Sequence, residues 1–189
     1  MMISINDLKQ GKIVRYNNEP YIIIEYQHSR TAQRRAFVRT RLRHLTNNSV
    51  LEKTFNSSDK IEEANVERKN ANYLYNTGDS YYFMDEENYE EISFPKSELG
   101  LIPNFLKDGM KVIILYCDGQ PATVEVAKKV TLEIKDTEPA VRGNTASGNV
   151  MKDAVLETGH HISVPIFVQR GEKVVINTDN GEYVERSNE

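Results

Sequence analysis

Short runs of alternating apolar and polar residues make up most of the chain, and turn-forming residues separate them. Alternation with a period of two is typical of strands that bury one face. Four such runs in the first third are predicted strands: 12–16, 21–26, 36–45 and 50–55. Asn17 and Asn18, which tolerate a positive φ, predict a tight hairpin turn between the first two. The stretch from His28 to Arg35 has no apolar residue larger than Ala32, so we expect an exposed loop or hairpin tip there.

The same rhythm continues toward the C-terminus. Further predicted strands lie at 73–75, 81–84, 89–94, 111–117, 123–126, 130–134, 162–168, 173–177 and 182–184. A short helical stretch is predicted at Pro95, and Asp118-Gly119 and Asn180-Gly181 predict hairpin turns. Short strands at this spacing are typical of barrels and not of βαβ units. We therefore expect an all-β chain of three small barrels in a row, at 1–66, 67–128 and 129–189.

The charges are distributed unevenly, although the formal net charge is only -4. Between Tyr26 and Leu51 there is no Asp or Glu, yet six arginines fall there: Arg30, Arg34, Arg35, Arg39, Arg41 and Arg43. From 78 to 98 the balance is reversed: acidic residues are frequent, and Lys96 is the only basic residue. A localised basic patch on an acidic protein favours an oriented encounter with a polyanion.

The arginine-rich strand has two interpretations. Arg35, Arg39, Arg41 and Arg43 occupy alternate positions, so they share one face of the strand. This face could contact nucleic acid, because planar, forked guanidinium donors suit phosphate. It could instead be a solvated face paired with acids on neighbouring strands, such as Glu52. We favour nucleic-acid contact, because acids are missing from this whole stretch of an acidic chain.

Several other function classes find no support in the sequence. Cys117 is the only cysteine and the four histidines lack metal-site spacing, so we expect no metal and no cofactor. No P-loop, nucleophile elbow or dinucleotide fingerprint occurs, so we do not expect an enzyme. The acids at 85–91 are interpreted as a solvated rim. No apolar run is long enough to cross a bilayer, and the first residues do not form a secretory signal, so we expect a cytoplasmic protein.

Several spaced motifs resemble one known family, bacterial elongation factor P. The C-terminal signature is similar at Lys152-Asp153-Ala154, Gly159, Ile162, Val164-Pro165, Val168 and Gly171. Further matching segments are 52–55, 73–79, 83–85, 136–139, 143–148 and 181–184. These motifs occur in order and span the whole chain.

The resemblance implies a fold and a partner. The first barrel would be SH3-like, and the next two would be OB-fold barrels. Members of the family bind the ribosome between the peptidyl and exit sites, beside the peptidyl-tRNA and the ribosomal RNA. They promote peptide bond formation at consecutive prolines without catalysing a reaction themselves. We expect a monomer, and the alternative function is a general RNA-binding module that lacks polyproline rescue.

The tip of the first barrel is where the sequence departs from the family. The family's loop usually reads Pro-Gly-Lys-Gly, with a lysine that is often enzymatically extended; the aligned residues here are Thr31, Ala32, Gln33 and Arg34. Gln33 replaces that lysine, and no lysine occurs between Lys12 and Lys53. Three outcomes stay open: an unmodified tip, which we favour, a modifying enzyme that acts on Arg34, or altered activity.

Other site residues follow from the same resemblance. Arg30, Arg34 and Arg35 would hold the acceptor end of the tRNA, beside the arginine face. Gly143-Asn144-Thr145 aligns with the family's Gly-Asp-Thr loop, which is thought to contact the exit-site codon on the small subunit. Tyr183 and Arg186 match the family's closing residues and are expected near tRNA or small-subunit contacts.

Overall fold

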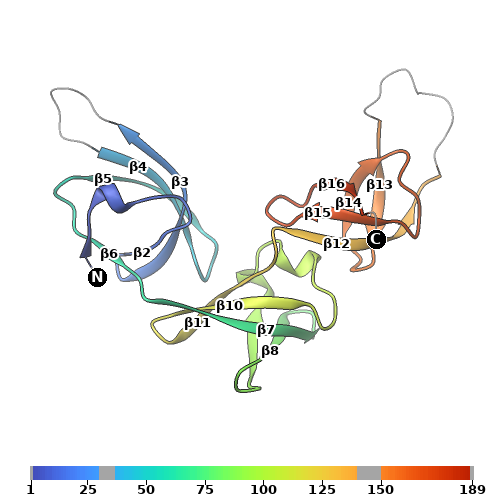
Figure 1. Cartoon of the computed structure of the whole chain (residues 1–189), viewed down its shortest axis with the longest axis horizontal. Coiled ribbons are helices and arrows are strands. Elements are labelled where there is room, and N and C mark those ends of the chain that lie inside the picture. The colour runs from blue at the N-terminus through green and yellow to red at the C-terminus, as the bar shows by residue number, and fades with distance from the viewer. Residues whose placement is uncertain (1, 30–36, 140–149, 188–189) are drawn as a thin grey trace.

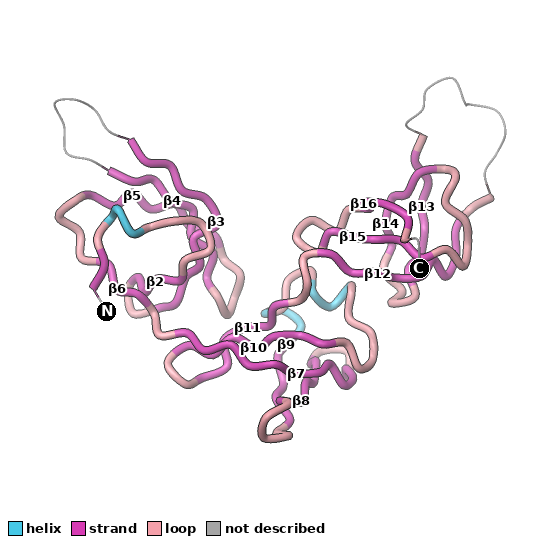
Figure 2. The backbone as a smooth tube through the Cα atoms, in the orientation of Figure 1, coloured by secondary structure: helices cyan, strands magenta, loops and turns pink. Residues whose placement is uncertain are grey.

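The structure, a computed structural model, describes residues 2–29, 37–139 and 150–187. These residues form three separate antiparallel sheets that follow one another along the chain. Each sheet curls into a barrel, and the first and third barrels lie on opposite sides of the second (Figure 1). Helix in the described part of the chain is limited to three single 3-10 turns (Figure 2). The all-β prediction is confirmed.

The first sheet has the strand order β1-β6-β2-β3-β4-β5. Its elements are β1 (Met2–Ile3), η1 (Ile5–Asp7), β2 (Ile13–Tyr16), β3 (Glu19–Ser29), β4 (Phe37–His44), β5 (Val50–Asn56) and β6 (Ile61–Glu63). Asn17 and Asn18 join β2 to β3 with φ values of 50° and 68°, as the predicted hairpin turn requires. β3 and β4 form a long hairpin whose last pair is Ser29 with Phe37.

The second sheet has the order β11-β10-β7-β8-β9. Its elements are β7 (Val66–Asn76), β8 (Ser80–Asp85), β9 (Glu91–Pro95), η2 (Lys96–Glu98), η3 (Ile102–Asn104), β10 (Lys111–Cys117) and β11 (Gln120–Glu125). The predicted turn at Asp118-Gly119 is confirmed, with both residues at positive φ. The predicted helical stretch after Pro95 is the 3-10 turn η2.

The third sheet has the order β14-β13-β12-β15-β16. Its strands are β12 (Lys129–Thr137), β13 (Met151–Leu156), β14 (His161–Pro165), β15 (Lys173–Asn177) and β16 (Tyr183–Arg186). Gly181 lies at a φ of 79° in the turn that joins the last two strands. Strand β14 is shorter than the predicted 162–168, because a turn begins after Pro165 and Val168 donates its N–H back to the Pro165 carbonyl.

The first two barrels share a small apolar contact. Ile13 and Leu45 of the first barrel pack with Leu115 and Cys117 of the second, and all four are buried. Beside them, the Arg15 guanidinium donates to the carboxylate of Asp118. A polar contact lies nearby, because the Asn48 side-chain amide donates to the Glu98 carbonyl at 2.6 Å. These contacts fix the orientation of the first barrel, which carries the β3–β4 hairpin, on the second barrel.

The second and third barrels are joined by a side chain that crosses between them. Phe105 follows η3 in the second barrel, yet it is fully buried in the apolar core of the third. The Thr158 hydroxyl donates to the Asn104 carbonyl at 2.6 Å, and the Thr178 hydroxyl donates to the Ala127 carbonyl at 2.8 Å. The third barrel therefore depends on a residue from the second for part of its core.

Candidate nucleic-acid interface

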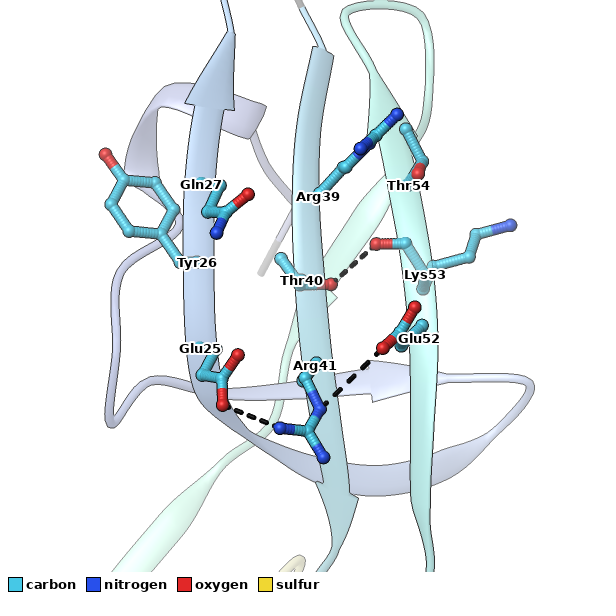
Figure 3. Close-up of a pocket in the computed structure, with 9 residues that line it drawn as sticks. All are labelled: Glu25, Tyr26, Gln27, Arg39, Thr40, Arg41, Glu52, Lys53 and Thr54. Carbon is cyan, nitrogen blue, oxygen red and sulfur yellow. Dashed lines mark hydrogen bonds and ion pairs between the residues drawn. The ribbon is translucent and has the colours of Figure 1, made fainter.

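Strand β4 carries three described arginines on one face. Arg39, Arg41 and Arg43 are exposed, while Val38, Thr40, Leu42 and His44 between them are buried. The buried set packs into the first barrel because successive side chains on a strand point to opposite faces. The predicted shared face is therefore confirmed for these three arginines. Figure 3 shows two of them, Arg39 and Arg41, on the middle strand of the β3–β4–β5 ribbon.

Arg41 lies between two carboxylates. Its guanidinium donates to Glu25 Oε1 at 2.7 Å, and its Nε lies 3.9 Å from Glu52 Oε1 (Figure 3). The hypothesis of a face paired with neighbouring acids is thus correct for this one arginine. All three side chains are well exposed, and exposed ion pairs contribute about 1 kcal/mol or less. A phosphate could therefore replace either carboxylate at little cost.

Arg39 and Arg43 differ from Arg41. Within residues 2–29, 37–139 and 150–187, no carboxylate lies within ion-pair distance of either guanidinium. Arg39 lies over the ring of Phe37, with its guanidinium carbon 5.8 Å from the ring centroid. A guanidinium spread over an aromatic face keeps its donors directed outward. Arg39 is therefore the best placed of the three to meet an anion.

The face also forms an open groove of about 490 Å³ between β3, β4 and β5. Its described lining includes Tyr26, Gln27, Arg39 and Thr54 (Figure 3). Tyr26 is exposed, but its ring points away from Arg39 and Arg41 (Figure 3). A shallow, polar groove with exposed cations suits an extended, charged polymer better than a small apolar ligand.

Glu25 is a member of this face that the sequence reasoning missed. It lies just before the acid-free stretch, and the register of β3 with β4 pairs it directly with Arg41. The alternation on each strand was visible in the sequence, but the register between the strands was not. The register also shifts between Ile23 and Glu25, which the alternating pattern does not reveal.

The predicted tip lies mostly outside the described residues. Arg30, Thr31, Ala32, Gln33, Arg34 and Arg35 all fall within residues 30–36. The prediction that the tip begins at His28 is wrong, because His28 and Ser29 pair with Val38 and Phe37 as part of β3. The two strands of this hairpin flank the segment at its start and its end.

The third barrel holds the remaining predicted residues. Gly143, Asn144 and Thr145 lie outside the described residues. Tyr183 is half-buried against the core, and burial raises the pKa of its phenol. Arg186 donates to Glu172 Oε1 at 3.3 Å. The structure does not bring these residues together with the arginine face, because the first and third barrels lie apart on either side of the second (Figure 1).

The interpretation of 85–91 as a solvated acidic rim is wrong for Asp85. Its side chain is fully buried, and its Oδ1 accepts the Glu87 N–H at 2.7 Å. Its Oδ2 has no hydrogen-bond partner among the described residues, and Lys69 Nζ lies 3.9 Å away. Asp85 thus holds the turn that follows β8. The turn also explains why β9 begins at Glu91 and not at Tyr89, whose φ is 59°.

Two of the described histidines, His44 and His161, have side-chain or backbone partners. His44 Nδ1 accepts the Thr46 N–H at 3.1 Å, and its Nε2 lies 3.2 Å from Glu19. His161 Nδ1 lies 2.8 Å from Asp153. In the part of the chain that the structure describes, no group of three or more His, Cys, Asp or Glu side chains is placed to hold a metal ion. No described helix is long and apolar enough to span a membrane.

Comparison with known families matches three domains in order. Residues 4–61 match the Elongation factor P KOW-like domain, and residues 66–124 match the Elongation factor P OB domain. Residues 130–186 match the family described as "Elongation factor P, C-terminal".

Curated relatives match over their whole length. An Elongation factor P of Thermodesulfovibrio yellowstonii is 44% identical over 188 residues, which cover 100% of both chains. An Elongation factor P of Moorella thermoacetica is 41% identical over 98% of this chain and 100% of its own. Among solved structures, a Eukaryotic translation initiation factor 5A from Methanococcus jannaschii matches with a TM-score of 0.53 at 23% identity. It covers 67% of this chain and 92% of its own, and supports the fold alone.

Proposed function

The chain belongs to the elongation factor P family of translation elongation factors, and we propose that it binds the ribosome between the peptidyl and exit sites. There it would lie beside the peptidyl-tRNA and promote peptide bond formation where consecutive prolines stall synthesis. We propose that it acts in the cytoplasm, as a monomer, with ribosomal RNA and the peptidyl-tRNA as its partners.

One observation carries this proposal: the three family domains follow one another in order, and the first presents an exposed arginine face. An RNA backbone is the polyanion that such a face fits, because forked guanidinium donors match phosphate oxygens. Arg39 and Arg43 are directed outward, and Arg41 is held only by exposed ion pairs. This arrangement supports contact with the backbone of tRNA or ribosomal RNA next to the hairpin tip.

The proposed contribution is positioning and not catalysis by a side chain. Proline is a poor partner in peptide bond formation, and a factor that steadies the peptidyl-tRNA lowers the entropic part of the barrier. The contacts of Arg15 with Asp118, and of Asn48 with the Glu98 carbonyl, support this role. They hold the first barrel against the second. The β3–β4 hairpin is therefore held in a defined position, from which it could orient the peptidyl-tRNA.

We propose that the tip works without modification. Gln33 stands where the family carries its modified lysine, and an amide both donates and accepts hydrogen bonds. Arg30, Arg34 and Arg35 flank it in sequence and would hold the acceptor end of the tRNA. Intact-mass measurement on protein from its native host tests this point. A mass above that of the bare chain, located by fragmentation to Arg34, would replace the unmodified tip with an enzymatically modified one.

We propose that the third barrel faces the small subunit. Gly143, Asn144 and Thr145 would contact the exit-site codon, and Asn144 keeps an acceptor while it adds a donor that the family's Asp lacks. Tyr183 and Arg186 would contribute further contacts to RNA. Asn144→Asp restores the family's residue and should change codon preference without changing stall relief at its favoured codon.

A translation assay tests the proposed function. Two reporters are compared in a reconstituted system, one with consecutive prolines and one with alanines in their place. We expect the chain to raise the yield of the proline reporter and to leave the alanine reporter unchanged. If saturating protein binds ribosomes but gives no relief, the proposal fails.

A second function is favoured by Gln33 itself. Loss of the family's tip lysine is compatible with a general RNA-binding module that has no role at prolines. Such a module would bind unrelated single-stranded RNAs as tightly as ribosomes, with a strong salt dependence. Exclusive binding to ribosomes would rule it out.

A further inference from the structure

We propose that Phe167 and Arg186 form a stacking site for one base of single-stranded RNA on the third barrel. This inference rests on the proposed function, because the RNA it invokes is the messenger on the small subunit. The site is separate from the arginine face of the first barrel.

Phe167 is presented outward by a rigid turn. Its side chain is 53% exposed, although Val168 beside it is fully buried in the core of the third barrel. Ile166 donates its N–H to the Val150 carbonyl at 3.1 Å, and Val168 donates to Pro165 at 3.0 Å. The backbone on both sides of the ring is therefore fixed. A single exposed apolar residue is common on surfaces, so the ring alone indicates nothing.

Arg186 supplies the second feature. Its guanidinium carbon lies over the Phe167 ring, 5.2 Å from the ring centroid, which is within the range of a cation–π contact. The guanidinium also donates to Glu172 Oε1 at 3.3 Å, while Glu172 Oε2 accepts the Gln169 N–H at 2.9 Å. The turn that carries the ring thus also holds the arginine in place. Aromatic rings and guanidinium planes are the two surfaces on which nucleobases stack.

The position of the pair in the barrel is the third feature. Met151 at the start of β13 pairs with Pro165 at the end of β14, so Phe167 lies at the end of the sheet where β13 begins. In chain order, β13 and β14 are the second and third strands of this barrel. Oligonucleotides bind OB folds over the second and third strands and the loop between the first and second. Phe167 lies at that end, beside the point where the chain enters β13.

The surroundings favour a base over a protein partner. The turn from 167 to 173 carries Arg170 and Lys173 against one acid, Glu172, which is already engaged with Arg186. Protein interfaces need a continuous apolar centre, whereas one exposed ring with a guanidinium over it suits a single base and its phosphates. We therefore assign single-stranded RNA as the occupant.

The absence of tryptophan from the sequence gives a direct test. Phe167→Trp creates a single fluorescent ring at the site, and hexaadenylate is the probe. We expect saturable quenching as a base stacks on the indole. Tyr89→Trp is the matched control, since Tyr89 is 75% exposed on the second barrel and should show no saturable response. No quenching at 167, or equal quenching at 89, would overturn the assignment.

Two further variants guard against a folding artefact. Phe167→Leu keeps an apolar side chain without a ring face, and we expect it to weaken hexaadenylate binding about five-fold or more. Arg186→Lys keeps the positive charge but removes the planar guanidinium, and it should also weaken hexaadenylate binding. Circular dichroism confirms that each variant is folded. Folded variants that bind as tightly as the unsubstituted chain would overturn the stacking site.

The result is separable from the proposed function. If Phe167→Trp responds to RNA but the chain gives no relief at prolines, the stacking site stands and the proposed function fails. If the chain relieves stalls while hexaadenylate does not quench the fluorescence of the Phe167→Trp variant, only this inference fails. Quenching by ribosomes without messenger, and none by hexaadenylate, would assign the ring to a contact with the ribosome itself and would also overturn the inference.

Discussion

The ring of Phe105 lies edge-on to the imidazole of His160, with ring centroids 5.8 Å apart and the planes at 86°. Phe105 belongs to the second barrel and His160 to the turn between β13 and β14 of the third. Because Phe105 is fully buried there, the core of the third barrel is completed by a residue from outside it. The last two barrels should therefore unfold together and not independently.

Phe105→Ala tests this coupling. Removal of a buried phenylalanine ring costs about 3–5 kcal/mol. We expect the free energy of unfolding to fall by that amount in denaturant titration, with the second and third barrels still unfolding in one transition. Leu101→Ala is the control, because Leu101 lies in the same segment but is exposed. A loss of less than about 1 kcal/mol for Phe105→Ala would contradict the shared core.

The pH dependence of stability should report on His160. Burial lowers the pKa of His160 below its ordinary 6.5, and the neighbouring His161 lowers it further. The unfolded chain therefore takes up a proton before the folded chain does, so stability is full above 6.5 and falls as the pH drops toward the folded pKa. Thermal unfolding between neutral and mildly acidic pH measures this loss. His160→Gln should flatten that part of the profile, and an unchanged profile would count against the effect.

The single cysteine should report on the contact between the first two barrels. Burial, followed by the hydrogen bond to Asp118, raises the pKa of the Cys117 thiol to about 11. We expect very slow reaction with a thiol reagent at neutral pH, because little thiolate is present and the sulfur is covered. Leu45→Ala removes a neighbour across the contact and should speed labelling about ten-fold or more, which corresponds to loosening by about 1.4 kcal/mol.

Leu51→Ala is the matched control for that labelling experiment. Leu51 packs against the core of the first barrel itself and not against Cys117. Its substitution should leave the labelling rate nearly unchanged. Equal acceleration by both variants would mean that the thiol reports general unfolding and not the contact between the barrels.

The arginines of β4 should contribute unequally to RNA binding. Arg39 is free of carboxylates among the described residues, whereas Arg41 is partly neutralised by Glu25 and Glu52. We expect Arg39→Ala to weaken ribosome binding and to lower its salt slope by about 1, with a smaller effect for Arg41→Ala. Glu25→Gln should strengthen binding, because it releases Arg41. An effect of Arg41→Ala as large as that of Arg39→Ala would contradict this order.

Period-two patterns were enough to predict the all-β fold and the outward face of β4. The turn dipeptides Asn17-Asn18 and Asp118-Gly119 located two hairpin turns, because their residues tolerate positive φ. The strands β1, β6 and β13 were not predicted. The first two are too short to show alternation, and β13 (Met151–Leu156) carries Lys152 and Asp153 in its first half.

What the sequence could not predict depends on contacts between distant segments. The Glu25–Arg41 pair needs the β3–β4 register, and the burial of Phe105 needs the docking of two barrels. Asp85 is buried because its carboxylate accepts a turn N–H, although its acidic neighbours suggest a solvated position. Local pattern carries no information on any of these three.

The rate of a single Pro–Pro bond on a stalled ribosome tests most directly whether this chain promotes peptide bond formation. Ribosomes that hold a peptidyl-tRNA ending in proline react with prolyl-tRNA, with and without protein whose intact mass equals that of the bare chain. We predict that the unmodified protein raises the rate at least ten-fold and that it leaves a reaction with phenylalanyl-tRNA unchanged, about 1.4 kcal/mol of selective assistance. An unchanged Pro–Pro rate with the protein bound would contradict the proposed function.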